Sequence, residues 1–104
     1  MRRRALSLLF AAFILAPAVA RARDDHERAR AALAAGEIKP LAEILAAIEQ
    51  RYVGRAIEVE LDREDDRWVY EMKMLPPSGR IFKLEVDAAT GIVRDTDGPV
   101  QERR

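Results

Sequence analysis

The sequence predicts an α+β fold, in which one main amphipathic helix and a short N-terminal helix pack on an antiparallel meander of three to four strands. Two observations support this fold class. Apolar residues recur with the period of a helix as far as Tyr52, and from Ala56 onward they alternate with polar residues, as in half-buried strands. Because short polar loops separate these strands, consecutive strands should be antiparallel neighbours.

The N-terminal residues have the three parts of a secretory signal. Three arginines precede an apolar run from Ala5 to Leu15, and small residues follow up to Ala20. We expect cleavage after Ala20, with Ala22 as the alternative, and therefore a periplasmic or secreted protein. The apolar run is shorter than the ~20 residues that cross a bilayer, so we expect no membrane span after cleavage.

Charge and cysteine content narrow the classes of partner. Without the three arginines of residues 1–20, the chain keeps 15 basic residues against 18 acidic ones, a net charge of −3. The basic residues are scattered singly and offer no surface that tracks phosphates, so nucleic acid is not an expected partner. The sequence has no cysteine, which leaves neither a disulfide nor a cysteine lipid anchor.

Four segments follow from these patterns: a signal peptide (1–20), a short N-terminal helical segment (21–36), one domain (37–95) and a disordered tail (96–104). Within the second segment, acidic residues begin a helix at Asp24, and Gly36 stands where a left-handed C-cap is needed. The apolar face of this helix is thin, so we expect a peripheral brace.

The main helix has a continuous apolar stripe. Pro40 suits its first turn. The residues at helical spacing on one face are Leu41, Ile44, Leu45, Ile48 and Tyr52. This stripe should cover the apolar face of the sheet.

Alternation assigns each strand a buried and a solvated face. In the first strand, residues 56–62, the expected buried residues are Ile57, Val59 and Leu61. In the second strand, residues 67–75, and the third, residues 80–87, they are Trp68, Tyr70, Met72, Met74, Phe82, Leu84 and Val86. A short last strand is expected at residues 92–94.

A tight turn follows the third strand in "VDAATGIV". Asp87 can accept hydrogen bonds from backbone N–H groups two or three residues further on, and Gly91 can adopt the positive φ that closes the reversal. This chemistry makes a turn rather than an active site.

The ordered combination of these elements resembles the PepSY domain family. The resemblance covers residues 37–95 and includes the helix, the acidic alternating strand, "RWVYEMKM" and the turn with Asp87 and Gly91. It implies one helix on an antiparallel sheet and a protein partner in the cell envelope, a peptidase or a sensor, that the domain regulates or inhibits. The family has no catalytic residues to transfer, and we expect the domain to act without an attached peptidase domain.

The residues themselves also argue against catalysis. His26 is the sole histidine and lies in a polar stretch, where a solvated surface residue is the simpler interpretation than a metal ligand. The acidic run from Asp62 to Asp66 lacks the spacing of a calcium loop. The one possible imidazole base, His26, is distant in sequence from the hydroxyls of Ser78, Thr90 and Thr96. We therefore expect no enzymatic activity, no cofactor and no metal centre.

The second face of the sheet is the candidate binding surface. It mixes apolar and charged residues, which suits a protein partner or a second copy of the chain, although isolated exposed apolar residues are also normal. The candidate residues are Val69, Glu71, Lys73, Leu75, Ile81 and Lys83. The alternative function is a small-ligand or metal carrier that uses the acidic strand and hairpin.

Overall fold

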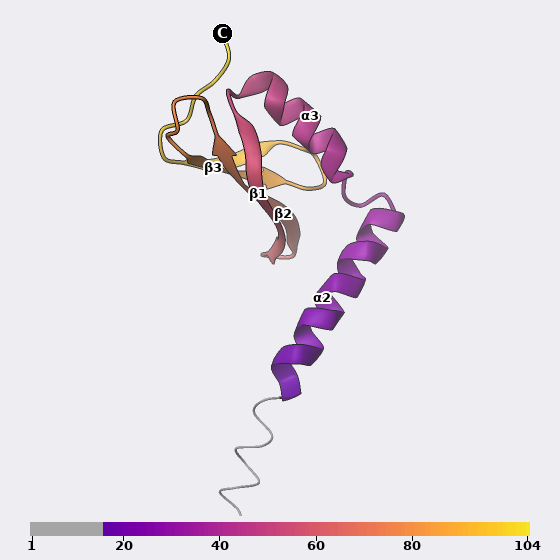
Figure 1. Cartoon of the computed structure of the whole chain (residues 1–104). Helices are drawn as coiled ribbons and strands as arrows, with labels where there is room; N and C mark the ends of the chain where they lie inside the picture. The colour runs from indigo at the N-terminus through magenta and orange to yellow at the C-terminus, as the bar shows by residue number, and fades with distance from the viewer. Residues whose placement is uncertain (1–15) are drawn as a thin grey trace, which may run out of the picture. The chain divides into compact units, whose positions relative to one another are not determined.

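The computed structural model describes residues 16–104 (Figure 1). It divides into two units between Ala35 and Gly36. The first unit contains helix α2 (Ala16–Ala34). Gly36, just after this unit, has a φ of +74°, as the capping pattern predicts. The helix begins before Asp24 because alanine, the strongest helix former, recurs through residues 16–23. The n-region and apolar run of the predicted signal lie outside the described residues, and its cleavage stays a prediction.

The second unit contains helix α3 (Leu41–Arg51) and all four strands. Ile44 and Ile48 are buried, as is Tyr52 at the C-cap, and Leu41 and Leu45 are half-buried. The predicted stripe is therefore the face by which α3 packs. Among residues 16–104, no helix combines the length and the apolar character that crossing a membrane requires.

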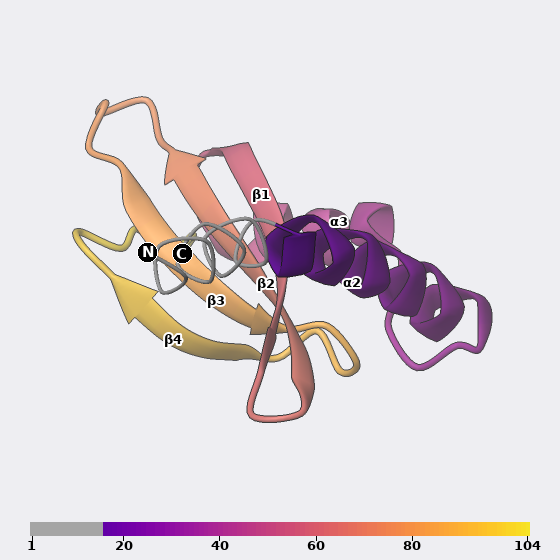
Figure 2. The ribbon, with the colours of Figure 1, turned by 90° about the horizontal axis from the view of Figure 1, so that it is seen from below.

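The sheet is an antiparallel meander in the order β1-β2-β3-β4, and Figure 2 shows the strands side by side in that order. Its strands are β1 (Arg55–Glu64), β2 (Arg67–Leu75), β3 (Phe82–Asp87) and β4 (Val93–Asp97). Asp65 and Asp66 form the two-residue loop between β1 and β2, with φ of 47° and 63°. These angles fit the type I′ turn of tight hairpins, where aspartate is tolerated. The predicted α+β fold is confirmed.

One face of the sheet, here called the closed face, builds the core with α3. The rings of Tyr52 and Phe82 lie 6.1 Å apart between centroids, and the Tyr70 hydroxyl donates to the carbonyl oxygen of Lys39 at 3.3 Å. The buried residues of this unit on α3, its preceding loop and the sheet include Ile38, Ile44, Ile48, Tyr52, Tyr70, Met72, Met74, Phe82, Leu84 and Val86.

Ile57 does not join this core, although alternation places it there. A β-bulge shifts the register between Ala56 and Glu58, so Ile57 has no partner on β2 and stays 46% exposed. Because the extra residue changes the parity of the strand, Ala56 joins Val59 and Leu61 as the residues opposite Met74, Met72 and Tyr70.

The predicted disordered tail is wrong. Strand β4 extends to Asp97, and the residues after it run beside the end of α3. Val53 donates its backbone N–H to Gln101 at 2.8 Å, and Arg103 donates its own to Arg51 at 2.7 Å. The second bond satisfies the carbonyl of Arg51, one of the acceptors that the C-terminal end of a helix leaves free. The compact unit therefore includes the whole C-terminal segment.

Candidate functional site

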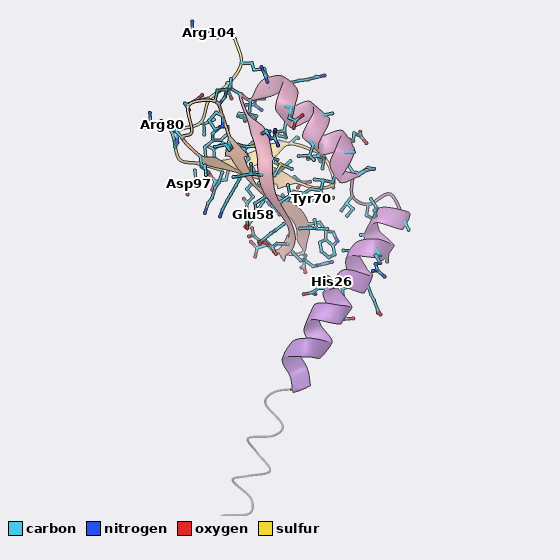
Figure 3. The ribbon with its side chains drawn as sticks, in the orientation of Figure 1. His26, Glu58, Tyr70, Arg80, Asp97 and Arg104 are labelled. Carbon is cyan, nitrogen blue, oxygen red and sulfur yellow. The ribbon has the colours of Figure 1, made fainter. Side chains whose placement is uncertain are left out.

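The candidate site is the face of the sheet opposite α3, here called the open face. Figure 3 shows Glu58 and Asp97 on this side and Tyr70 on the side of the helix. Antiparallel sheets commonly have one solvated face, so its exposure alone indicates no function. The arrangement of its charges is more informative.

Strand register aligns these charges in two rows that cross all four strands. In the first row, here called the carboxylate row, each residue is the cross-strand partner of the next: Glu60, Glu71, Glu85 and Asp95. In the second, here called the lysine row, the partners are Glu58, Lys73, Lys83 and Asp97. The two rows are two residues apart along the strands and lie on the same face.

Both rows line a shallow groove of about 380 Å³. Besides the eight charged residues of the two rows, the lining includes Met72 and Leu84, which lie between the two rows in the register and are themselves buried residues of the closed face. Six carboxylates face two ammonium groups there, so the groove has a net charge of −4 when all are ionised. Such a surface attracts cationic groups and repels another groove of the same kind.

The structure brings most of the predicted binding residues to this face. Glu71, Lys73 and Lys83 line the groove, and Leu75 and Ile81 remain 36% and 46% exposed. Whether they contact a partner stays a prediction.

Val69 is the exception, because none of its surface is exposed. It lies between Asp62 of β1 and Asp87 of β3 in the register. A short β-branched side chain on a central strand is covered by flanking residues, whereas longer charged side chains on the same strand reach solvent. The prediction that Val69 belongs to an accessible surface is corrected accordingly.

The lysine row contains an ion pair. The Nζ atom of Lys73 lies 2.9 Å from Oε2 of Glu58, and both side chains are about half-exposed. This hydrogen bond and the accompanying charge attraction lower the pKa of the Glu58 carboxyl and raise the pKa of the Lys73 ammonium. Lys83, next to Lys73 across the strands, adds to the positive potential on Glu58.

The carboxylate row shows the opposite effect. Burial, followed by the charges of Asp62, Glu64 and Glu60, raises the pKa of Glu71. A hydrogen bond with Glu64, followed by burial and the Glu64 charge, raises the pKa of Glu85, although Arg94 acts against this shift. Like charges on directly opposed residues destabilise a sheet, so the row has an energetic cost in the free protein.

Two groups of carboxylates on this face have oxygen atoms within 4.8 Å of one another. One group is Glu60, Asp62 and Glu71, and the other is Glu64, Glu71 and Glu85. Hard cations prefer such oxygen ligands. However, exposed acidic side chains often cluster without an ion, and this clustering by itself does not indicate a metal centre.

The turn after β3 has the predicted geometry. Oδ1 of Asp87 accepts hydrogen bonds from the backbone N–H groups of Ala89 and Thr90, both at 3.0 Å, and Gly91 has a φ of +78°. Burial would raise the pKa of Asp87, but the bonds from Thr90 and Ala89 and the nearby Arg67 outweigh it, so the pKa is lowered.

The same turn has a structural role that the sequence did not indicate. Ala88 is fully buried, donates its N–H to the Trp68 carbonyl at 2.9 Å, and accepts a bond from the Lys39 N–H at 2.8 Å. It therefore connects β2 to the loop before α3. Asp87 and Gly91 shape this junction and bear no chemistry of their own.

The remaining polar candidates do not form a catalytic arrangement within residues 24–104, whose side chains the structure describes. His26 is exposed on α2. The Ser78 hydroxyl accepts from the Gln101 amide at 2.9 Å, and the Thr90 hydroxyl accepts from the Ile92 N–H at 3.2 Å. These hydroxyls stabilise loops and turns.

Sequence reasoning missed the two charged rows. Alternation indicated that Glu58, Glu60 and Glu71 point toward water, and this was a usable signal. Their alignment with Glu85 and Asp95 depends on the register of all four strands, which the sequence alone did not provide.

Comparison with known proteins agrees with this architecture. The family described as "Peptidase propeptide and YPEB domain", PepSY, matches residues 38–97. Searches of curated proteins and of solved structures gave no match. The matched segment contains α3, all four strands and the turn, and covers more than half of the sequence. The chain therefore belongs to the PepSY family.

Proposed function

We propose that this protein is an exported binding module that docks onto a peptidase or a sensor of the cell envelope and regulates or inhibits it. Domains of this family are peptidase-related interaction modules, generally without catalytic activity, and are typically exported. The observation that supports docking is the open face, where a charged groove crosses all four strands and α3 covers only the opposite side.

Site-specific crosslinking tests this proposal. A photoreactive amino acid at Lys83 places the probe on the open face, and the same amino acid at Gln50, exposed on α3, is the matched control. Produced in its native host, the Lys83 variant should form an adduct with one envelope protein that the Gln50 variant does not form. Recovery of the monomer alone from several open-face positions would contradict docking.

The regulatory part needs a second measurement. If the captured protein is a peptidase, the purified chain should lower its rate of hydrolysis of a fluorogenic peptide at stoichiometric amounts. If it is a sensor, the chain should change its signalling output. Unchanged activity in either assay would leave a binding protein without the proposed regulation.

A small-ligand or metal carrier is the alternative function. It would use the acidic strand and hairpin, where carboxylate oxygens of Glu60, Asp62 and Glu71 lie within 4.8 Å of one another. A carrier gains thermal stability when its ligand binds the folded state. Titration with calcium or copper, followed by calorimetry, separates the two functions, because a docking module should melt at the same temperature with and without these ions.

A further inference from the structure

We infer that the groove of the open face binds an extended, arginine-rich or lysine-rich segment of a partner protein, which crosses the strands along the carboxylate row. This inference rests on the proposed docking function and specifies the chemistry of the docked segment. It is carried by the charges, the register and the dimensions of the face.

The first argument is charge complementarity. Six carboxylates and two lysines line the groove, and one lysine, Lys73, is already paired with Glu58. Among the side chains of residues 24–104, no ion pair within 4.0 Å involves the four members of the carboxylate row. A cationic partner would form the direct ion pairs that the carboxylate row lacks among these side chains.

A second copy of the chain is a poorer occupant. Two open faces brought together would place a net charge of −4 against another of −4. Only the lysine row could offset this repulsion, and half of its positive charge is satisfied by Glu58 within the same chain. Face-to-face dimerisation is therefore disfavoured by the same charges that favour a basic segment.

The dimensions of the row fit an extended peptide. Four strands spaced about 4.8 Å apart give a row about 14 Å long. In an extended chain, alternate side chains lie about 7 Å apart on one side, so three alternate basic residues span roughly the same length. Such a peptide could place a guanidinium or ammonium group near both ends and the middle of the row.

The lysine row favours one orientation of the bound peptide relative to the strands. A basic peptide aligned with the strands would bring one of its charges onto Lys73 and Lys83, which face each other across β2 and β3. A peptide that crosses the strands over the carboxylate row avoids both lysines. Lys73 and Lys83 thus repel a basic segment from one side of the carboxylate row.

The test uses two blocked synthetic peptides and the full chain without its predicted signal peptide. One peptide alternates threonine with three arginines, because threonine favours the extended state, and the other has neutral citrulline in place of arginine. Calorimetric titration at low salt should show the arginine peptide binding at least about tenfold more tightly, about 1.4 kcal/mol. The difference should shrink at high ionic strength.

Matched variants locate the binding. Glu71→Gln with Glu85→Gln removes two charges from the row, and Glu37→Gln with Glu49→Gln removes two exposed charges elsewhere in the same unit. We expect the first pair to weaken binding about tenfold and the second to change it less than about twofold. Lys83→Glu should strengthen binding. Thermal melts confirm that each variant is folded.

Several results would overturn the inference: equal affinity for both peptides, equal weakening by both variant pairs, or calcium binding at the row without peptide binding. Its failure is distinguishable from failure of the proposed function. Capture of an envelope partner at Lys83 with no arginine-peptide binding rejects the basic segment alone. Arginine-peptide binding at the row with monomer alone recovered from cells rejects the envelope partner and leaves the peptide chemistry standing.

Discussion

The closed and open faces of the sheet come from the same four strands, and they differ in what decides their composition. On the closed face, residues such as Met72, Met74 and Leu84 are at most 2% exposed, and packing against α3 restricts them to apolar side chains. On the open face, the neighbouring positions hold two rows of charges. Stability therefore depends on the closed face, and the open face is available for recognition.

The largest contrast should come from the same substitution on the two faces. Ile44→Ala removes a side chain that is 2% exposed in α3, and we expect a loss of about 2 to 5 kcal/mol in the free energy of unfolding, measured by urea denaturation. Ile81→Ala, at 46% exposure, should cost within about 0.5 kcal/mol. Similar losses at both positions would show that the faces are not energetically distinct.

We expect the C-terminal segment after Asp97 to contribute to the stability of the unit that contains α3 and the closed face. Ending the chain at Asp97, where the family match also ends, removes the backbone hydrogen bonds of Gln101 and Arg103. At roughly 0.5 to 1.5 kcal/mol each, their loss should lower stability by about 1 to 3 kcal/mol. Glu102→Gln removes the exposed ion pair with Arg51 and should cost less than about 1 kcal/mol. An unchanged melting temperature after truncation would contradict this role.

The carboxylate row predicts a pH-dependent effect on stability. Here, removing side-chain charges should raise the stability, whereas the two changes above should lower it. Because the pKa values of Glu71 and Glu85 are raised, the folded state binds these protons more tightly than the unfolded state. The cost of burying these charged carboxyls and crowding them together is therefore present at neutral pH. It is relieved as the pH falls through the raised values toward the ordinary glutamate value of about 4.3.

Glu71→Gln with Glu85→Gln should thus stabilise the protein at pH 7, by roughly 0.2 to 1 kcal/mol on the scale of cross-strand pairs. The gain should vanish near pH 4, where the wild-type carboxyls are protonated. Thermal melts between pH 7 and pH 4 measure the gain of the double variant, and a pH-independent gain would argue against a charge-dependent cost of the row.

Asp87 has the opposite linkage, since its pKa is lowered. Its contribution to stability is present above the ordinary aspartate value and is lost at lower pH. Melts continued below the ordinary aspartate value measure the Asp87 effect.

The smallest effect is expected at the bulge. Ile57→Lys should change stability by less than about 0.5 kcal/mol, because this side chain is 46% exposed and outside the register. Val59→Lys introduces the same charge at a half-buried position opposite Met72 and should destabilise clearly more. Equal losses in urea denaturation would mean that Ile57 packs on the closed face after all.

The sequence predicted α3, the order of the strands and the turn at Asp87, because each depends on local periodicity or local backbone chemistry. It failed where one residue changes the parity of a strand, as at Ile57, and where burial depends on neighbouring strands, as at Val69. The tail after Asp97 was missed because its hydrogen-bond partners, Arg51 and Val53, lie about half the chain away.

By itself, the sequence determined the α+β class, the apolar stripe of α3, the Asp87 turn and the resemblance to the PepSY family, since these are patterns within short segments. Only the tertiary structure decided which charges stand next to one another. The two-residue loop at Asp65 and Asp66 is short enough to set the register of β1 and β2, but residues 76–81 between β2 and β3 are not. Pairing of whole strands fixed that register, and with it the carboxylate row.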